Sequence, residues 1–181
     1  MVAPMYQLAG VTPRVTSGRL PAGDEGTRKT LDMMRTLAEE GARDLTVRET
    51  AIAIVKAAEA AAHNSLAELQ ALFEFVRDRV RFTSDILGVE TLQGPAYTLR
   101  VMAGDCDDRA VLLVALARSI GLPADLSFRV VALNKARPGS FSHVYVVASL
   151  NGRRIALDPT YPINPMGWQY PHPFRSAEAR A

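Results

Sequence analysis

The chain has 181 residues, of which 48% are hydrophobic and 22% are charged, and its formal net charge is +2. These values are typical of one globular domain and exclude a disordered chain, a collagen and a coiled-coil rod. The small positive charge comes without any basic run, so we expect no nucleic-acid partner. A single cysteine excludes an internal disulfide framework and a cysteine-rich zinc site.

The sequence carries no signal for a membrane or for export. No stretch reaches the apolar length of a membrane span. Met1–Gly10 lacks a basic start followed by an apolar block, so we expect no secretory signal. We therefore expect a cytoplasmic protein without a membrane partner.

The N-terminal half of the chain is predicted to be helical after a short irregular start. Residues 1–26 contain repeated proline and glycine, which predicts a flexible arm. Apolar residues at helical spacing and capping-box signatures then predict helices. There are three of them: residues 27–42, a helix from the capping box Thr46–Glu49 to about Ala62, and one from the similar box at Ser65 through Val76.

The middle of the chain contains the clearest helix of the sequence. Val80–Thr83 predicts a short strand, and the glycine-containing residues 84–103 predict a long loop. Asp105 is then a good helix N-cap, and Gly121-Leu122-Pro123 is a typical helix end. Because the body of this helix is apolar on most sides, we expect it to be central and buried.

Strands dominate the C-terminal part. Asn151-Gly152 is typical of a type I′ hairpin turn, and the proline-rich residues 159–181 are predicted to be irregular. Helices followed by an antiparallel sheet indicate an α+β fold. We expect one domain over residues 27–161 and a Pro-rich tail over 162–181. The predicted strands are Leu126–Ala132, Phe141–Leu150 and Arg153–Leu157.

Cys106, the only cysteine, follows the predicted cap Asp105 in the first turn of the central helix. Free N–H groups and the positive end of the helix dipole stabilise a thiolate there, which lowers the pKa of a cysteine. The same N–H groups can hold an oxyanion when the sulfur attacks a carbonyl. The structural alternative is a small buried hydrophobic residue, as many free cysteines are. The charged neighbours of Cys106 favour a nucleophile.

A nucleophile needs a base, and the chain has three histidines. His63 lies between two predicted helices and His172 lies among prolines, so both are most simply loop residues. His143 lies inside a strand of apolar and aromatic residues. It is either a core histidine or the base.

The hairpin register connects His143 to a carboxylate. A two-residue loop at Asn151-Gly152 places Leu150 opposite Arg153, and therefore Tyr145 opposite Asp158. His143 is two residues from Tyr145 and shares its face, so His143 and Asp158 form a diagonal pair. Asp158 can then orient the imidazole as the third member of a triad, although it could also be a turn residue before Pro159.

Three segments resemble the transglutaminase-like superfamily, whose fold is similar to that of papain-type cysteine proteases. Gly104-Asp105-Cys106-Asp107-Asp108 with the following helix is similar to the nucleophile helix of the family. Phe141–Val146 resembles its histidine strand, and Leu157-Asp158-Pro159-Thr160 its aspartate strand. The resemblance implies that Cys106 is the nucleophile, His143 the general base and acid, and Asp158 the residue that orients it.

The resemblance also bears on the remaining parts of the site. It implies a second oxyanion donor upstream of the cysteine, for which Gln93 is the best-placed amide and Tyr97 the next; either could equally be a polar loop residue. The extra domains of the large calcium-dependent members do not fit into 181 residues, so we expect no calcium requirement, no other metal and no cofactor. Asp107 and Asp108 are then interpreted as first-turn helix residues.

The resemblance implies a thioester acyl-enzyme formed on a protein or peptide amide, but it leaves hydrolysis and transfer to an amine open. Residues 85–95 look similar to small transglutaminase-like proteins of bacteriophages and prophages. This implies phage structural proteins as partners and a virion-associated location. A second hypothesis is accordingly a structural or assembly module with an idle or single-use triad. A third, a metal site of Cys106, His143 and Asp158, lacks supporting ligands.

Overall fold

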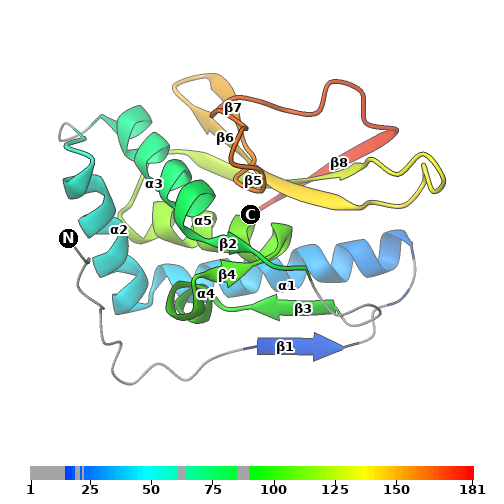
Figure 1. Ribbon diagram of the computed structural model, residues 1–181, viewed down its shortest axis with the longest axis horizontal. Helices are drawn as coiled ribbons and strands as arrows, with labels where there is room; N and C mark the ends of the chain where they lie inside the picture. The colour runs from blue at the N-terminus through cyan, green and yellow to red at the C-terminus, as the bar shows by residue number, and fades with distance from the viewer. Residues whose placement is uncertain (1–14, 19–20, 22, 61–63, 85–89) are drawn as a thin grey trace.

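The computed structural model describes residues 15–18, 21, 23–60, 64–84 and 90–181. Helices form one side of the molecule and a four-stranded sheet forms the other (Figure 1). Helix α5, Cys106–Ser119, contacts the four other helices and strand β6, His143–Leu150. The predicted α+β fold, with a central helix packed between N-terminal helices and a C-terminal antiparallel sheet, is confirmed.

The helices around α5 bury the apolar faces that their sequences predict. On the first of them, Leu31, Met34, Leu37 and Ala38 are buried. Helix α5 itself is buried on all sides from Asp107 to Ala117, as expected for a helix that is apolar all round. The surrounding helices are α1, Asp24–Ala42; α2, Leu45–Ala57; α3, Ser65–Arg79; and α4, Pro95–Val101.

The two predicted N-caps, Thr46 and Ser65, are wrong, although α3 begins at Ser65 as predicted. The side chain of Asp44 caps α2 by accepting hydrogen bonds from the N–H groups of Thr46 and Val47, so Thr46 is inside the helix. Asn64 caps α3 by accepting from the N–H of Ala67. Each cap is an Asx residue just before the predicted Thr or Ser, and Asx residues are at least as good N-caps. Helix α2 also ends at Ala57 rather than near Ala62.

The predicted loop over residues 84–103 is largely regular structure. It contains β3, Glu90–Gln93, then α4, then β4, Ala103–Gly104; residues 85–89 lie outside the described residues. Pro95 begins α4, and proline is well suited to the first turn of a helix because no intrahelical N–H is needed there. Strand β4 pairs in parallel with β2, Arg81–Phe82.

The described residues before α1 include a strand that the sequence pattern did not predict. Strand β1, Val15–Gly18, pairs antiparallel with β3, and α1 begins at Asp24. The expected arm therefore contains a strand and the first residues of a helix. The part of it before residue 15 lies outside the described residues.

The four-stranded sheet has the order β7-β6-β5-β8, and all its pairs are antiparallel. Leu150 pairs with Arg153, as the two-residue turn predicts. Asn151 and Gly152 have φ angles of 50° and 75°, which is the type I′ geometry. The predicted hairpin register is confirmed. The bounds are Asp125–Ala132 for β5, Arg153–Leu157 for β7 and Arg175–Arg180 for β8.

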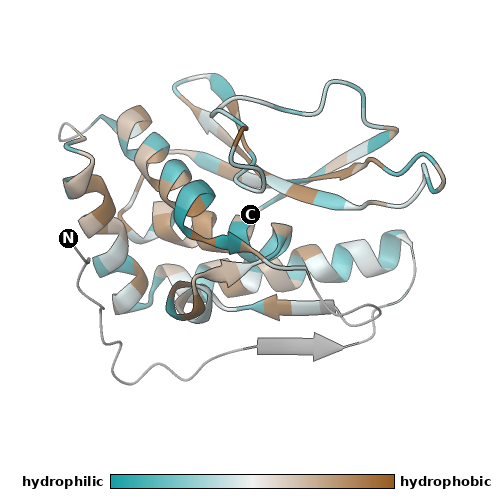
Figure 2. Ribbon diagram, viewed as in Figure 1, coloured by the Kyte–Doolittle hydropathy of each residue, from teal (hydrophilic) through white to brown (hydrophobic). Residues whose placement is uncertain are grey.

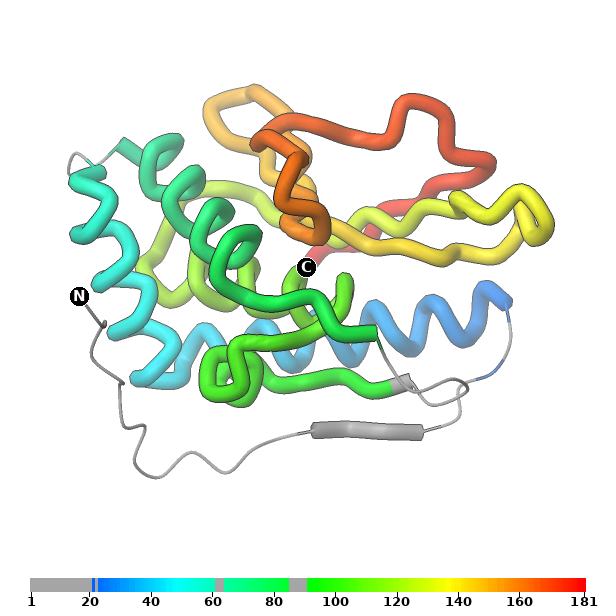
Figure 3. The backbone as a smooth tube through the Cα atoms, viewed as in Figure 1, coloured from blue at the N-terminus to red at the C-terminus, as the bar shows by residue number. Residues whose placement is uncertain are grey.

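The prediction of an irregular C-terminal segment is wrong for its last part. Strand β8 adds to the sheet at the free edge of β5. The prolines of this segment, which suggested irregular structure, all lie before β8, in the connection that leads to it. Figure 3 traces this connection from the end of β7 to the red strand at the C-terminus.

The two faces of the sheet have different neighbours. Val144, Val146 and Ala148 pack with α5 in the main core. On the other face, Tyr145 and Val147 belong to a smaller apolar cluster to which Tyr170 of the C-terminal segment adds its ring. Figure 2 shows hydrophilic residues at the hairpin tips and on the first turns of α1. Among the described helices, none combines the length and the apolar character needed to cross a lipid bilayer.

Candidate active site

The N-terminus of α5 is held in place by a network of aspartates. Asp105 is the N-cap, and it forms a capping box with Asp108. Asp108 also accepts a hydrogen bond of 2.7 Å from the backbone N–H of Gln93 in β3. A Cβ on Gly104 would lie 2.7 Å from the Cβ of Asp108, so only glycine fits there. Cys106 therefore lies in the first turn of a helix capped by Asp105, as predicted, and Asp108 also ties this turn to β3.

Asp105, Asp107 and Asp108 have carboxylate oxygens within 4.8 Å of one another. Asp107 accepts a hydrogen bond of 2.7 Å from the N–H of Asp108, and Asp105 and Asp108 cap the helix. These contacts agree with their interpretation as first-turn residues that satisfy the unpaired N–H groups of the helix.

The diagonal pair predicted from the hairpin register is present. His143 Nε2 lies 2.9 Å from Asp158 Oδ2, and both residues are buried. Because the carboxylate faces Nε2, that nitrogen holds the proton of the hydrogen bond, and Nδ1 remains to accept another.

Asp158 is itself held by its neighbours. Its Oδ1 accepts a hydrogen bond of 3.0 Å from the N–H of Thr160, which closes an Asx turn. The side-chain amide of Asn164 donates to Oδ2 at 3.5 Å. Both oxygens of Asp158 therefore have partners, and the carboxylate has a fixed direction.

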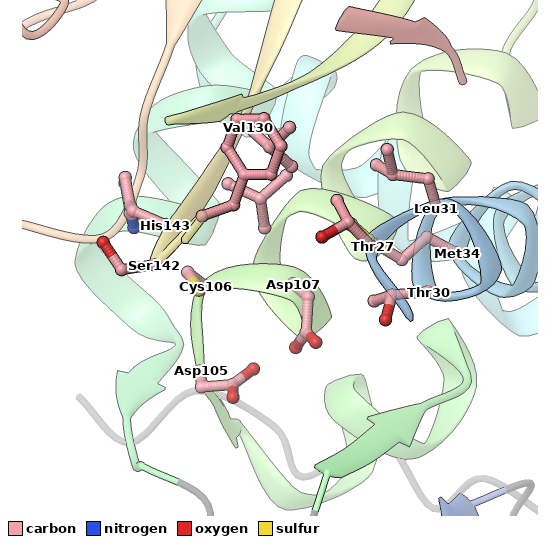
Figure 4. Close-up of a pocket in the computed structure, with 12 residues that line it drawn as sticks. Thr27, Thr30, Leu31, Met34, Asp105, Cys106, Asp107, Val130, Ser142 and His143 are labelled. Carbon is pink, nitrogen blue, oxygen red and sulfur yellow. The ribbon is translucent and has the colours of Figure 1, made fainter. Parts of the chain in front are cut away.

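Cys106 and His143 line one pocket of about 270 Å³. Figure 4 shows Cys106 with His143 and Ser142 on one side and α1 on the other. The carboxylates of Asp105 and Asp107 also point into this space. The remaining lining residues are Thr27, Thr30, Leu31 and Met34 of α1, and Val130, Phe141 and Val144 of the sheet.

The electrostatics of the thiol differ from the prediction. Burial of the Cys106 sulfur raises its pKa above the ordinary value of 9.0, and Asp107 and Asp105 add to this effect. The backbone N–H groups of Val144 and Cys106 act in the opposite direction but do not prevail. The predicted lowering of the pKa is therefore wrong for this state, because burial and two carboxylates outweigh the helix terminus. Among the described residues, no hydrogen bond joins the thiol to His143.

The structure does not bring Gln93 into the pocket. Its backbone N–H donates to Asp108, and its side-chain oxygen lies 3.5 Å from the hydroxyl of Thr98. The residues that line the pocket do not include Gln93 or Tyr97. The second oxyanion donor implied by the resemblance is thus not assigned. His172 is exposed, and His63 lies outside the described residues.

Sequence reasoning missed the role of Arg109, whose buried side chain holds the turn after Asp158 in place. Arg109 is only 1% exposed. Its guanidinium donates to the carbonyl of Thr160 at 2.8 Å, and to the carbonyls of Val76 and Arg77 at 3.0 Å and 2.9 Å. It thus ties the Asp158 turn to the end of α3. A signal was present: an arginine inside an otherwise apolar helix must have buried partners.

The sequence of this chain matches one protein family. The model of the transglutaminase-like superfamily matches residues 52–159, which include Cys106, His143 and Asp158. Among curated proteins, none matches this chain significantly.

Two solved structures match this chain, one of them with a TM-score above 0.5. One is a candidate protease from Parabacteroides distasonis, with a TM-score of 0.53 and 13% identity over 77% of this chain and 30% of that one. The other is a candidate cysteine protease from Cytophaga hutchinsonii, with a TM-score of 0.48 and 20% identity over 73% of this chain and 42% of that one. This chain therefore spans less than half the length of either protein.

Proposed function

Because this chain belongs to the transglutaminase-like superfamily, we propose that it is a cysteine enzyme that opens amide bonds of a protein or peptide through a thioester. The observation that supports the proposal is one pocket lined both by a thiol at a helix N-terminus and by an imidazole that is bound to a buried carboxylate. In this proposal Cys106 is the nucleophile, His143 the base and acid, and Asp158 the residue that orients His143.

The first half of the reaction forms the thioester. The thiol of Cys106 gives its proton to Nδ1 of His143 as the sulfur attacks the amide carbonyl, and a bond between sulfur and carbon forms. The imidazolium then gives this proton to the amide nitrogen as the carbon–nitrogen bond breaks. The amine leaves, and the acyl group remains on the sulfur.

The environment of the thiol sets the order of these events. Burial and the carboxylates of Asp107 and Asp105 raise the pKa of Cys106, which favours a neutral thiol in the resting state of the proposed enzyme. Proton transfer to His143 then accompanies the attack rather than preceding it. In this proposal Asp158 stabilises the imidazolium that forms, and the N–H of Cys106 at the start of α5 stabilises the oxyanion.

The second half of the reaction decides the class of enzyme. If His143 removes a proton from water, the thioester is hydrolysed and the protein is a peptidase or amidase. If it removes a proton from a primary amine, the acyl group is transferred, as in a transglutaminase. Both outcomes use the same residues.

The proposal is tested with an amide-peptide library, incubated with and without a primary amine and analysed by mass spectrometry. We expect acids or amine adducts from the wild-type protein, and neither from Cys106→Ala with an unchanged circular-dichroism spectrum. A fluorescent thiol-reactive electrophile adds a second measurement, since its labelling of Cys106 should depend on His143. Absence of turnover together with labelling that is unaffected by His143→Ala would overturn the proposal and favour the phage assembly module with an idle triad.

A further inference from the structure

The connection between β7 and β8 is anchored where it leaves the active site. We call residues 159–174 the cover segment. The guanidinium of Arg109 holds the carbonyl of Thr160, and Arg77 donates to the carbonyl of Asn164 at 3.3 Å. The start of the cover segment is therefore attached to α5 and α3, and Figure 3 shows the path of the segment from β7 to β8.

The cover segment is also attached to the sheet further along. The N–H of Gly167 donates to the carbonyl of Ala156 in β7 at 2.8 Å, and the N–H of Phe174 donates to the carbonyl of Ala132 in β5 at 3.0 Å. These bonds fix the segment against the face of the sheet that carries His143 and Tyr145. The family match ends at residue 159, so nearly the whole segment lies beyond it.

This path places Tyr170 on the catalytic histidine. The ring of Tyr170 packs edge-on against the His143 ring, with centroids 5.3 Å apart and an angle of 73°. The Trp168 ring packs edge-on against the Tyr170 ring, with centroids 4.8 Å apart. Tyr145 lies beside both rings, at 6.0 Å from His143 and 6.3 Å from Tyr170. His143 is only 8% exposed.

An edge-on aromatic ring has two effects at this position. It removes water that would compete for the His143–Asp158 hydrogen bond, and such a bond is stronger where the local dielectric is low. It also restricts the plane of the imidazole, since edge-to-face contacts between rings prefer a defined angle. Burial and the nearby Asp158 raise the pKa of Tyr170, so its phenol stays neutral in this environment.

We propose that Tyr170 is a positioning residue of the reaction, whose ring excludes water from the His143–Asp158 hydrogen bond and fixes the imidazole. The inference rests on the proposed function, because it assigns Tyr170 a role only through His143. It makes the cover segment a part of the active site rather than a tail.

The direct test measures water exclusion without any substrate. The protein is labelled with ¹⁵N-histidine, and the Nε2 proton of His143 is identified by its loss in His143→Ala. We expect this proton to exchange slowly with water in the wild type and in Tyr170→Phe, and at least ten-fold faster in Tyr170→Ala. Phe174→Ala removes an aromatic ring from the same segment, 53% exposed, and should leave the exchange rate unchanged. Equal exchange in wild type and Tyr170→Ala would overturn the proposal.

A second test measures the consequence at the thiol. The rate of Cys106 alkylation by iodoacetamide should fall several-fold in Tyr170→Ala, and stay within two-fold of wild type in Tyr170→Phe and Phe174→Ala. If Cys106 alkylation is slow in His143→Ala but normal in Tyr170→Ala, the role of Tyr170 is contradicted and the proposed function is not. A normal rate in both contradicts the proposed function itself. If Tyr170→Ala does not fold, Tyr170→Gln is used in its place. Glutamine keeps a long side chain but puts a polar group next to the imidazole of His143.

Discussion

His143 Nε2 and Asp158 Oδ2 lie 2.9 Å apart, although the two residues are not opposite each other in the hairpin. Strand β7 ends at Leu157, which pairs with Val146. Asp158 is therefore the first residue beyond the strand, and it reaches His143 diagonally. The contact depends on the register set by the turn at Asn151-Gly152, because a shift of one residue would turn the carboxylate to the other face.

Replacement of Asp158 by Asn should preserve the fold but impair catalysis. The amide keeps the shape of the carboxylate but cannot stabilise an imidazolium, and it favours the wrong tautomer of His143. We expect kcat/KM to fall by about 10²- to 10⁴-fold in the peptide assay. Asp125→Asn is the matched control, since Asp125 is exposed on β5. A similar loss in both variants would show that the effect is not specific to the site.

Replacement of Arg109 by Met should destabilise the protein strongly. It leaves the carbonyls of Thr160, Val76 and Arg77 without their donor in a buried place. We expect the free energy of unfolding in urea to fall by about 3 kcal/mol. Arg48→Met, on an exposed position of α2, should change it by less than about 0.5 kcal/mol. Equal stability of the two variants would contradict the role of Arg109 as a support.

Replacement of Gly104 by Ala should disturb the helix start that carries Cys106. The new Cβ would lie 2.7 Å from the Cβ of Asp108, so Asp108 and its capping bond must move. We expect a loss of about 1–3 kcal/mol in unfolding free energy and a changed rate of Cys106 alkylation. Gly139→Ala has open space around the new Cβ and should change neither. An unaffected alkylation rate in Gly104→Ala would mean that the helix start tolerates the shift.

The buried thiol should make stability depend on alkaline pH. Because the protein raises the pKa of Cys106 above its ordinary value of 9.0, the unfolded thiol ionises first. The free energy of unfolding is therefore unaffected by this thiol below about pH 9. Above that pH, ionisation of the thiol in the unfolded chain lowers the free energy of unfolding by up to about 1.4 kcal/mol per pH unit. Cys106→Ser lacks this contribution. Unfolding free energies of both proteins between pH 7 and about pH 10 should therefore converge or cross, whereas parallel curves would contradict a raised pKa.

Local patterns predicted where His143, Asp158 and Cys106 lie, because short stretches of chain fix those positions. The Asn-Gly turn sets a register, and the register places His143 beside Asp158. Asp105 is a typical N-cap and predicts the start of α5, so Cys106 is expected at the N-terminus of that helix. Each of these inferences spans one hairpin or one helix turn, so no long-range packing had to be known.

The predictions that were wrong concern features that depend on contacts between segments far apart in the sequence. The pKa of Cys106 is set by burial under elements that come together only in the fold, and a helix-end argument cannot include them. Proline and glycine suggested a loop before Cys106 and an irregular C-terminal segment. In the structure Pro95 begins a helix, and the prolines from 159 to 173 form the connection that brings β8 to the sheet edge.

Helix α1 supplies one wall of the pocket through Thr27, Thr30, Leu31 and Met34, and all four precede the family match, which begins at residue 52. The α1 wall of the pocket thus lies outside the matched region, which contains the proposed catalytic residues. In the proposed enzyme, substrate preference is therefore open to redesign at the half-buried Thr27 and Thr30, whereas Leu31 and Met34 are buried in the core and must be kept.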